Sequence, residues 1–333
     1  MNHLKDDQSS GGSLINGDYP LKVKSSIKWL YDNWRFLRKG QRKEYNAIVK
    51  KYTYKPSLGA VKEGDHSQLY TPSRLLCNYL WDDLNWSEIV KSLGGKVRIL
   101  ECGCGNGRYG RRVVKHLKQY DPQYLGFDAV QNDSWERHST EFPDMKYRTE
   151  LSADIASMLD TFKPNLIISQ SAIEHFSDDL NFFTSISEYC NSSTNSIIQI
   201  HMIPSPACLP LYLHHGYRQY CSININRIIE KLRGDFYVYN IHLGGWFEFW
   251  IMFLWVTLPT IGMKYFFPNR FPSAFRLKFK RSYMKMTKKI GNKQQRSSGP
   301  ASFFCLIVGS GGVTKPSTNS GKLIPASSNA NKG

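Results

Sequence analysis

The chain has 333 residues, 41% of them hydrophobic, which is enough for one domain of ordinary size with an extension. Its 44 Lys and Arg residues outnumber 27 Asp and Glu residues, and the net charge of +17 favours acidic partners such as nucleic acid, anionic lipid or an acidic glycan. Seven cysteines in no regular spacing and a polar N-terminus without a secretory signal exclude a disulfide-stabilised secreted domain and predict a cytoplasmic protein.

The first part of the chain divides into a polar tail and a helical layer. Residues 1–17 are rich in Ser, Gly and Asp, and we expect them to be disordered. Residues 18–95 predict three helices: one from Ser25 with an apolar stripe of Ile27, Leu30, Trp34 and Leu37, a second basic one to about Lys51, and a third that starts at Pro72. This layer would either close over a substrate or pack plainly against the rest of the domain.

The most informative stretch is VRILECGCGNGRYG, residues 97–110. Its apolar start is typical of a strand buried on both faces, and the apolar residues after it recur at helical spacing. Gly103, Gly105 and Gly107 therefore lie on a strand-to-helix turn, where glycine allows positive φ and lets a ligand approach bare backbone N–H groups. The helix that follows directs the positive end of its dipole at whatever fills the turn.

Two classes of ligand use such a turn. The residues from Gly105 to Gly110 match the dinucleotide pattern G-x-G-x-x-G, which is a weak signal alone. Glu101 favours the other class, because a carboxylate at the strand's end suits the ammonium group of S-adenosylmethionine (SAM) and repels a pyrophosphate. The stretch resembles the first motif of class I SAM-dependent methyltransferases, E-x-G-x-G-x-G. The resemblance implies a Rossmann-like α/β domain over residues 96–310, with seven strands of which the last is antiparallel.

The next two predicted strands each end near a carboxylate. Residues 124–128 form the first of them, and Asp128 lies 21 residues after Gly107, where it can accept the ribose hydroxyls of either NAD or SAM. Residues 145–151 form the other, followed by Asp154. In the methyltransferase family an acid at this place accepts from the adenine amino group, and the alternative is a helix N-cap.

The fourth predicted strand, residues 165–171, runs into Glu174 and His175. This segment is similar to the family's fourth motif, S-x-L-E-H, which implies that Gln170 and His175 lie near the transferred methyl group. His175 either accepts a proton from the methyl acceptor or braces the loop. Ser171 stands where metal-binding relatives have a Glu, so we predict no metal.

The fifth strand, residues 196–201, brings His201 to the same sheet edge as a second candidate base. The polar aromatic segment behind it contains His214, Tyr217 and Arg218, which suit the acceptor site of a sugar or another polyol. The alternative is a surface helix with its tyrosines packed inward.

An insertion of about 242–300 separates the sixth predicted strand, residues 235–241, from the last, residues 302–308. Within it, residues 245–296 form an aromatic block followed by eleven basic residues. This pattern indicates either a peripheral anchor on an anionic membrane or a hydrophobic flap with a solvated basic face, and the charge-free run is too short to span a bilayer. Nucleic acid is not expected, and residues 311–333 are expected to be disordered.

Together these features predict a SAM-dependent methyltransferase acting on an oxygen of a sugar or polysaccharide precursor. A small-molecule O- or N-methyltransferase is the nearest alternative. An NAD(P)-dependent oxidoreductase and a membrane-binding module with a degenerate nucleotide fold are alternatives from other classes.

Overall fold

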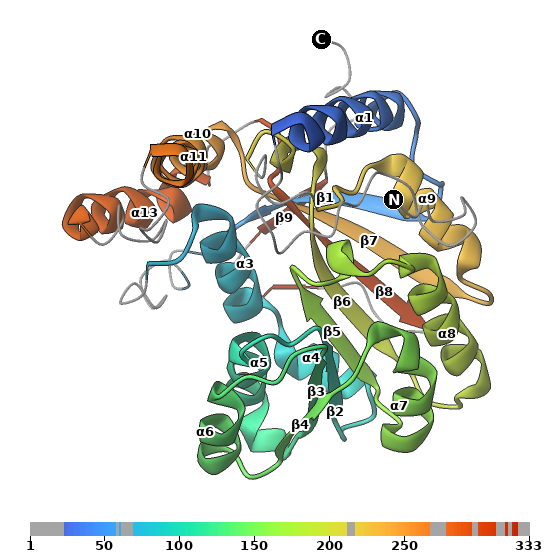
Figure 1. Cartoon of the computed structure of the whole chain (residues 1–333). Helices are drawn as coiled ribbons and strands as arrows, with labels where there is room; N and C mark the ends of the chain where they lie inside the picture. The colour runs from blue at the N-terminus through green and yellow to red at the C-terminus, as the bar shows by residue number, and fades with distance from the viewer. Residues whose placement is uncertain are drawn as a thin grey trace.

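The computed structural model describes residues 23–57, 60, 69–211, 217–266, 278–294, 299–310, 317–318 and 322–325. A nine-stranded sheet runs through the molecule in the order β4-β3-β2-β5-β6-β8-β7-β1-β9 (Figure 1). Seven of these strands match the seven predicted from the sequence: β2 (Arg98–Cys102), β3 (Gln123–Asp128), β4 (Met145–Thr149), β5 (Leu166–Gln170), β6 (Ile198–Pro204), β7 (Phe236–Leu243) and β8 (Phe303–Ser310).

Strands β4, β3, β2, β5 and β6 are parallel to one another. Strand β8 lies between β6 and β7 and is antiparallel to both. The predicted Rossmann-like fold with an antiparallel last strand is therefore confirmed. Neighbouring residues along a strand enter opposite cores: Ile99 belongs to one buried cluster and Leu100 to the other. Burial on both faces explains why these strands read as continuous apolar runs.

Two strands at the far edge correct the sequence analysis. The prediction of a second basic helix that ends at about Lys51 is wrong. Residues Val49–Lys55 form strand β1, which is parallel to β7 and places Tyr52 opposite Ile241. Its alternating, tyrosine-rich sequence suits a half-buried strand better than a helix. The tail expected to be disordered contains β9 (Lys322–Pro325), which pairs antiparallel with β1. Residues 1–17 lie outside the described residues.

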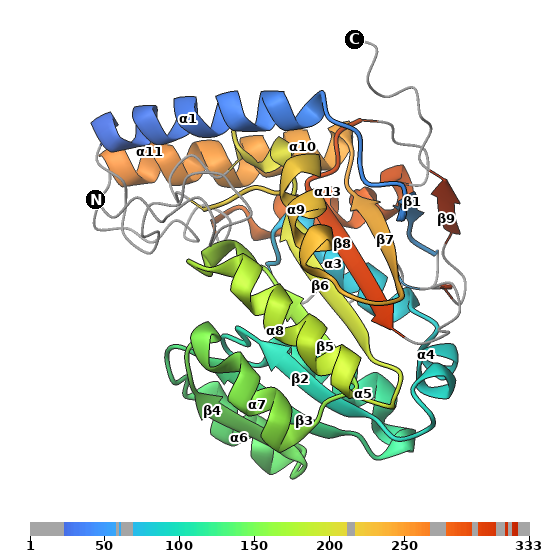
Figure 2. The ribbon, with the colours of Figure 1, turned by 90° about the vertical axis from the view of Figure 1, so that its right-hand side faces the viewer.

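Helices cover both faces of the sheet (Figure 2). One face carries α3 (Pro72–Asp83), α4 (Trp86–Ser92), α5 (Arg108–Leu117) and α6 (Ser134–Glu141). The other carries α7 (Ile155–Phe162), α8 (Asp179–Ser192) and α9 (Ser222–Lys231).

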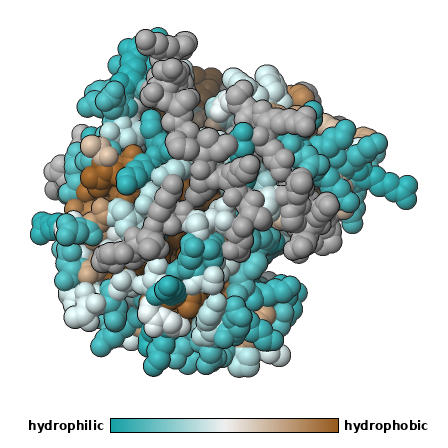
Figure 3. Space-filling model, turned by 180° about the vertical axis from the view of Figure 1, so that it is seen from behind, coloured by the Kyte–Doolittle hydropathy of each residue, from teal (hydrophilic) through white to brown (hydrophobic). Residues whose placement is uncertain are grey.

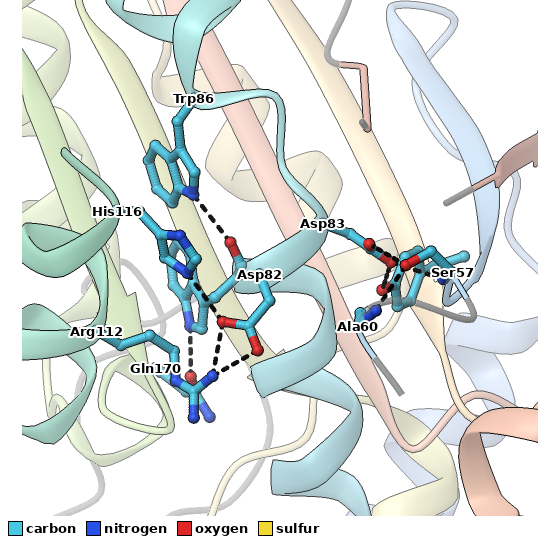
Figure 4. A network of polar contacts seen from close by, with 10 residues as sticks. Ser57, Ala60, Asp82, Asp83, Trp86, Arg112, His116 and Gln170 are labelled. Carbon is cyan, nitrogen blue, oxygen red and sulfur yellow. Dashed lines mark hydrogen bonds and ion pairs between the residues drawn. The ribbon is translucent and has the colours of Figure 1, made fainter. Parts of the chain in front are cut away.

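The C-terminal end of α3 fastens the helical layer to the sheet (Figure 4). Asp82 accepts from Arg112 of α5 at 2.6 Å and lies 2.9 Å from the His116 ring. The adjacent Asp83 turns the other way and accepts from the hydroxyls of Ser57 and Tyr54. The layer thus packs firmly against the domain through two neighbouring carboxylates.

The helix predicted from Ser25 exists as α1 (Val23–Gln41), but the predicted inner stripe is only half right: Leu30 and Leu37 pack inward, and Ile27 and Trp34 do not. Ile27 is 63% exposed and Trp34 is 47% exposed, whereas Trp29 is 1% exposed and packs with Leu37. The buried stripe also contains Asn33, whose amide donates to the Trp29 carbonyl. This bond satisfies a polar side chain in an inner position and conceals the true face from an apolar pattern.

The insertion forms α10 (Trp246–Met252), a π-helical turn (Phe253–Thr257), α11 (Leu258–Phe266) and α13 (Lys280–Gln294). Ile251, Met252 and Val256 enter the main core. The other side of these helices keeps a line of half-exposed residues: Trp246, Trp250, Leu254 and Leu258. Among the described helices, none is long and apolar enough to cross a membrane.

Glu248 of α10 is buried and holds the insertion to the domain. It accepts from Ser73 of α3 at 2.7 Å and from Ser302, which precedes β8. Burial raises the pKa of Glu248 to about 7.

The corrected face of α1 gives the first prediction. Replacing Trp29 by Ala leaves a cavity against Leu37 and should cost about 3–5 kcal/mol of unfolding free energy. Trp34→Ala on the exposed side should cost about 0.5 kcal/mol or less. Urea unfolding of both variants tests this, and equal losses would contradict the assigned face.

The buried Glu248 gives the second prediction. Between about pH 4.5 and 7 the folded state keeps a proton on Glu248 that the unfolded state has lost. The free energy of unfolding therefore falls as pH rises through that range. Glu248→Gln should therefore raise the melting temperature at pH 8 relative to the parent and change it little at pH 4.5. Melting curves across that range check this, and a difference independent of pH would refute it.

Candidate functional site

The turn after β2 adopts a left-handed backbone at each glycine of the motif. The φ angles are +67° at Gly103, +53° at Gly105 and +73° at Gly107. A Cβ at Gly103 would lie 2.5 Å from the Ala172 Cβ, and one at Gly107 would lie 2.6 Å from the Tyr147 hydroxyl. A Cβ at Gly105 would meet nothing within 4 Å, so this residue faces open space. The turn thus offers bare backbone to a ligand.

Asp128 at the end of β3 fixes the tip of this turn. Its Oδ2 accepts from the Gly105 N–H at 2.7 Å, and its Oδ1 accepts from the Val130 N–H at 3.3 Å. The carboxylate is partly exposed, so it can accept further hydroxyl groups from a ligand beside the glycines. The sequence motif and the predicted ribose carboxylate therefore lie together.

Glu101 lies beneath the turn rather than in the open. It is 1% exposed, and it accepts from the Tyr124 hydroxyl and from the backbone N–H of Gly110 in the first turn of α5. Burial raises the pKa of Glu101 to about 7. A partly ionised carboxyl group here still opposes a diphosphate at this helix N-terminus, and a cationic ligand beside it would favour its ionised form.

The ends of β3 and β4 carry two exposed apolar residues that the sequence analysis missed. Val130 is 72% exposed and follows β3, and Leu151 is 59% exposed and follows β4. Asp154 lies nearby, and its Oδ2 accepts from the Leu151 N–H at 3.3 Å instead of capping α7. An apolar residue one or two positions after a carboxylate at a strand end, Asp128 or Glu150, was the available signal. Two such residues at neighbouring strand ends suit contact with a flat aromatic base.

Gln170 joins the helical layer to the end of β5. Its Oε1 accepts from the indole Nε1 of Trp81 on α3 at 2.7 Å, and its Nε2 is buried without a partner among the described residues (Figure 4). The next residue, Ser171, has φ +55°, a left-handed conformation that is rare outside glycine. Such strain is typical of functional sites.

His175 lies on the turn after β5 and is exposed. The centre of its ring is 3.8 Å from that of Tyr217, so the structure brings together two predicted residues from distant segments. The neighbouring Glu174 is buried, and burial raises its pKa. His214, the third aromatic candidate, lies outside the described residues.

Arg218 does not take the predicted acceptor-binding position. It is fully buried, lies 3.1 Å from Asp179 in an ion pair, and donates to the Phe176 carbonyl at 3.0 Å. Tyr220 donates to the same Asp179 and to the Ile173 carbonyl. The cluster therefore braces the turn that carries His175. The sequence analysis missed this contact because the partner carboxylate lies on α8, about forty residues earlier in the chain.

His201 is also corrected. It is fully buried among Phe182 and Phe183 of α8, with its Nδ1 2.9 Å from the Ser169 hydroxyl. Burial lowers its pKa to about 3. A proton acceptor must reach the substrate, so His201 has a packing role and His175 is the remaining candidate base. In the described part of the chain, no group of three or more His, Cys, Asp or Glu residues could hold a metal.

The chain matches no protein-family model and no curated protein. Solved structures similar to it include a protein named as a sarcosine dimethylglycine methyltransferase from Galdieria sulphuraria, at 12% identity over 75% of this chain and 95% of that one, with a TM-score of 0.42. Coclaurine N-methyltransferase bound to N-methylheliamine and SAH is 11% identical over 87% and 88% of the two chains, with a TM-score of 0.41. The plantazolicin methyltransferase BpumL in complex with SAH is 11% identical over 84% and 98%, with a TM-score of 0.40.

Proposed function

We propose that this chain is an enzyme that transfers a methyl group from SAM. The observation that carries the proposal is the open Gly105 backbone, held by Asp128 and backed by the buried Glu101. A SAM molecule has a cationic amino-acid end, a ribose and a purine. The glycine turn, Asp128 and the exposed Val130 and Leu151 offer one surface to each of these parts.

The cofactor roles follow from these places. The backbone of Gly103, Gly105 and Gly107 would line the amino-acid end, and Asp128 would accept the ribose hydroxyls. Asp154 keeps an exposed carboxylate that would accept from the adenine amino group. Gln170 would offer its unpartnered amide near the methyl group. When bound, SAM supplies an activated methyl on a sulfonium.

The methyl acceptor is proposed to be a hydroxyl of a sugar or a related small polyol. The His175–Tyr217 pair supports this, because aromatic faces contact the C–H faces of a sugar while the ring edges bond its hydroxyls. In such a transfer the acceptor oxygen would form a bond to the methyl carbon while the carbon–sulfur bond broke and its electrons went to sulfur. The acceptor's proton would go to His175. Holding the reactants in line contributes about 7–11 kcal/mol to such a reaction.

A peripheral position at the inner face of an anionic membrane is proposed for the enzyme, with a lipid-linked sugar as a fitting acceptor. The half-exposed line of the insertion supports it: Trp246, Trp250, Leu254 and Leu258. The neighbouring α13 adds six exposed cations: Lys280, Arg281, Lys285, Lys288, Lys289 and Lys293. Tryptophan and lysine together are typical of membrane interfaces.

A glycine substitution with a matched control tests cofactor binding. Gly105→Ala should weaken SAM binding about tenfold or more, because a Cβ would fill the space that the ligand needs. Gly94→Ala is the control: Gly94 also has a left-handed backbone, at φ +78°, with open space around it, but it lies in the loop before β2. Both variants should lose about 1–2 kcal/mol of stability.

Isothermal titration with SAM, its demethylated product and NADH provides the measurement. Gly94→Ala should bind SAM like the parent. Equal loss in both variants would show a stability effect instead of a site. Binding of NADH without SAM would replace the proposal by a nicotinamide-dependent oxidoreductase.

A histidine substitution tests the acceptor chemistry. With the best hydroxyl acceptor from a panel of sugars and nucleotide sugars, His175→Asn should lower kcat about 10²–10⁴-fold and leave SAM affinity unchanged. Release of demethylated SAM measures the rate. A loss below tenfold would assign His175 to bracing. If no hydroxyl acceptor gave turnover while amines did, the sugar assignment would be wrong and methyl transfer would stand.

A further inference from the structure

The N-terminal helix α1 presents a cationic and aromatic face to the outside. Its buried side contains Trp29 and Leu37. On the opposite side Ile27, Tyr31, Trp34 and Arg38 follow at spacings of four, three and four residues, which places them on one stripe of a helix. Three of these four residues are apolar or aromatic, the kind of side chain that an amphipathic helix normally buries.

A shallow, open groove lies beside the C-terminal part of this stripe, lined by two aromatic and five cationic residues: Tyr31, Trp34, Arg35, Arg38, Lys39, Arg42 and Lys43. The guanidinium of Arg35 lies 5.7 Å from the centre of the Tyr31 ring, and that of Arg38 lies 5.2 Å from the centre of the Trp34 ring. The nearby acids, Asp32 and Glu44, are exposed and do not line the groove. The groove therefore suits an anion flanked by apolar material.

We infer that α1 docks this chain on an anionic lipid surface. The groove takes headgroup phosphates, and Ile27, Tyr31 and Trp34 reach the boundary of the acyl chains. This inference rests on the proposed peripheral position and is independent of methyl transfer. It adds a second element to that position, far from residues 245–296 in the sequence.

The fold brings the two elements to one end of the molecule. In both ribbon views α1 lies at the same end as α10 and α11 (Figures 1 and 2). Seen from behind, hydrophobic and hydrophilic residues adjoin at the upper right, where α10, α11 and α13 lie (Figure 3). Both elements therefore lie at one end of the molecule, and the inference has α1 and the insertion engaging the same lipid surface.

The chemistry of this end favours lipid over nucleic acid. Nucleic acids use cations and aromatic stacking, which α1 also offers. They provide no partner for exposed aliphatic side chains, yet Ile27 on α1 and Leu254 and Leu258 on the insertion are at least 44% exposed. Burial of such side chains in an acyl region is favourable, and it explains their presence beside the cations.

Sedimentation with vesicles tests the inference. The full chain should bind vesicles of phosphatidylcholine mixed with phosphatidylglycerol and not phosphatidylcholine alone. Each cation lost from such a contact lowers binding about fivefold, so the triple variant Arg35→Gln, Arg38→Gln, Arg42→Gln should bind on the order of 100-fold more weakly. The control carries Lys91→Gln, Lys96→Gln and Lys118→Gln, three exposed cations outside α1 and the insertion, and should change binding less than about fivefold.

A second variant separates the occupants. Trp34→Ala with Ile27→Ala should weaken binding to anionic vesicles, because apolar contact is lost at unchanged charge. If this variant bound vesicles as well as the parent, and if single-stranded RNA displaced the parent from the vesicles, the inference would be overturned in favour of nucleic acid. If the parent formed a dimer and the same variant did not, the occupant of the α1 groove would be a second copy of the chain.

The remaining outcomes distinguish the inference from the proposed function. If Trp250→Ala with Leu254→Ala abolished binding while the α1 variants kept it, the inference would fall and the peripheral position would stand. If the parent bound neither vesicle, both would fall. SAM titration of each variant reports methyl-donor binding separately, and melting curves matching the parent show that the variants fold.

Discussion

The site depends on one backbone constraint, the left-handed turn at Gly103, Gly105 and Gly107. Each φ value there would cost a side-chain-bearing residue about 1–2 kcal/mol, and two of the three positions also have no room for a Cβ. The hydrogen bond from the Gly105 N–H to Asp128 holds the turn against the next strand. A strand, a turn and a neighbouring carboxylate thereby make a surface on which, of the three glycines, Gly105 faces open space.

Buried polar groups then fix what surrounds this turn. Glu101 and Tyr124 connect β2, β3 and the first turn of α5. Arg218 and Asp179 do the same for the turn that carries His175, since Arg218 bonds the Phe176 carbonyl. Breaking a buried pair of this kind by removing one partner is costly, because the other charge is left unpaired.

The sequence predicted correctly those features that depend on short stretches of the chain alone. The glycine motif, Asp128 and the seven strands follow from local spacing, glycine chemistry and apolar runs. The features it missed depend on distant partners. The polar Asn33 lies on the inner face of α1 because its amide bonds the Trp29 carbonyl, so the apolar pattern does not reveal that face. Residues Val49–Lys55 form a strand because they pair with β7. Polar residues such as Arg218 and His201 resemble site residues until their partners Asp179 and Ser169 are placed.

Helix α3 connects the insertion with the end of β5. Near its N-terminus, Ser73 bonds Glu248 of the insertion, whose outer side carries the exposed tryptophans. At its C-terminal end, Trp81 bonds Gln170 beside the strained Ser171. The apolar, cationic end and the glycine turn are thus joined through one buried helix and two polar contacts. Helix α3 thus runs from the end of the molecule that carries α10 to the end of β5, and its two polar contacts fix both of those elements to the same rigid helix.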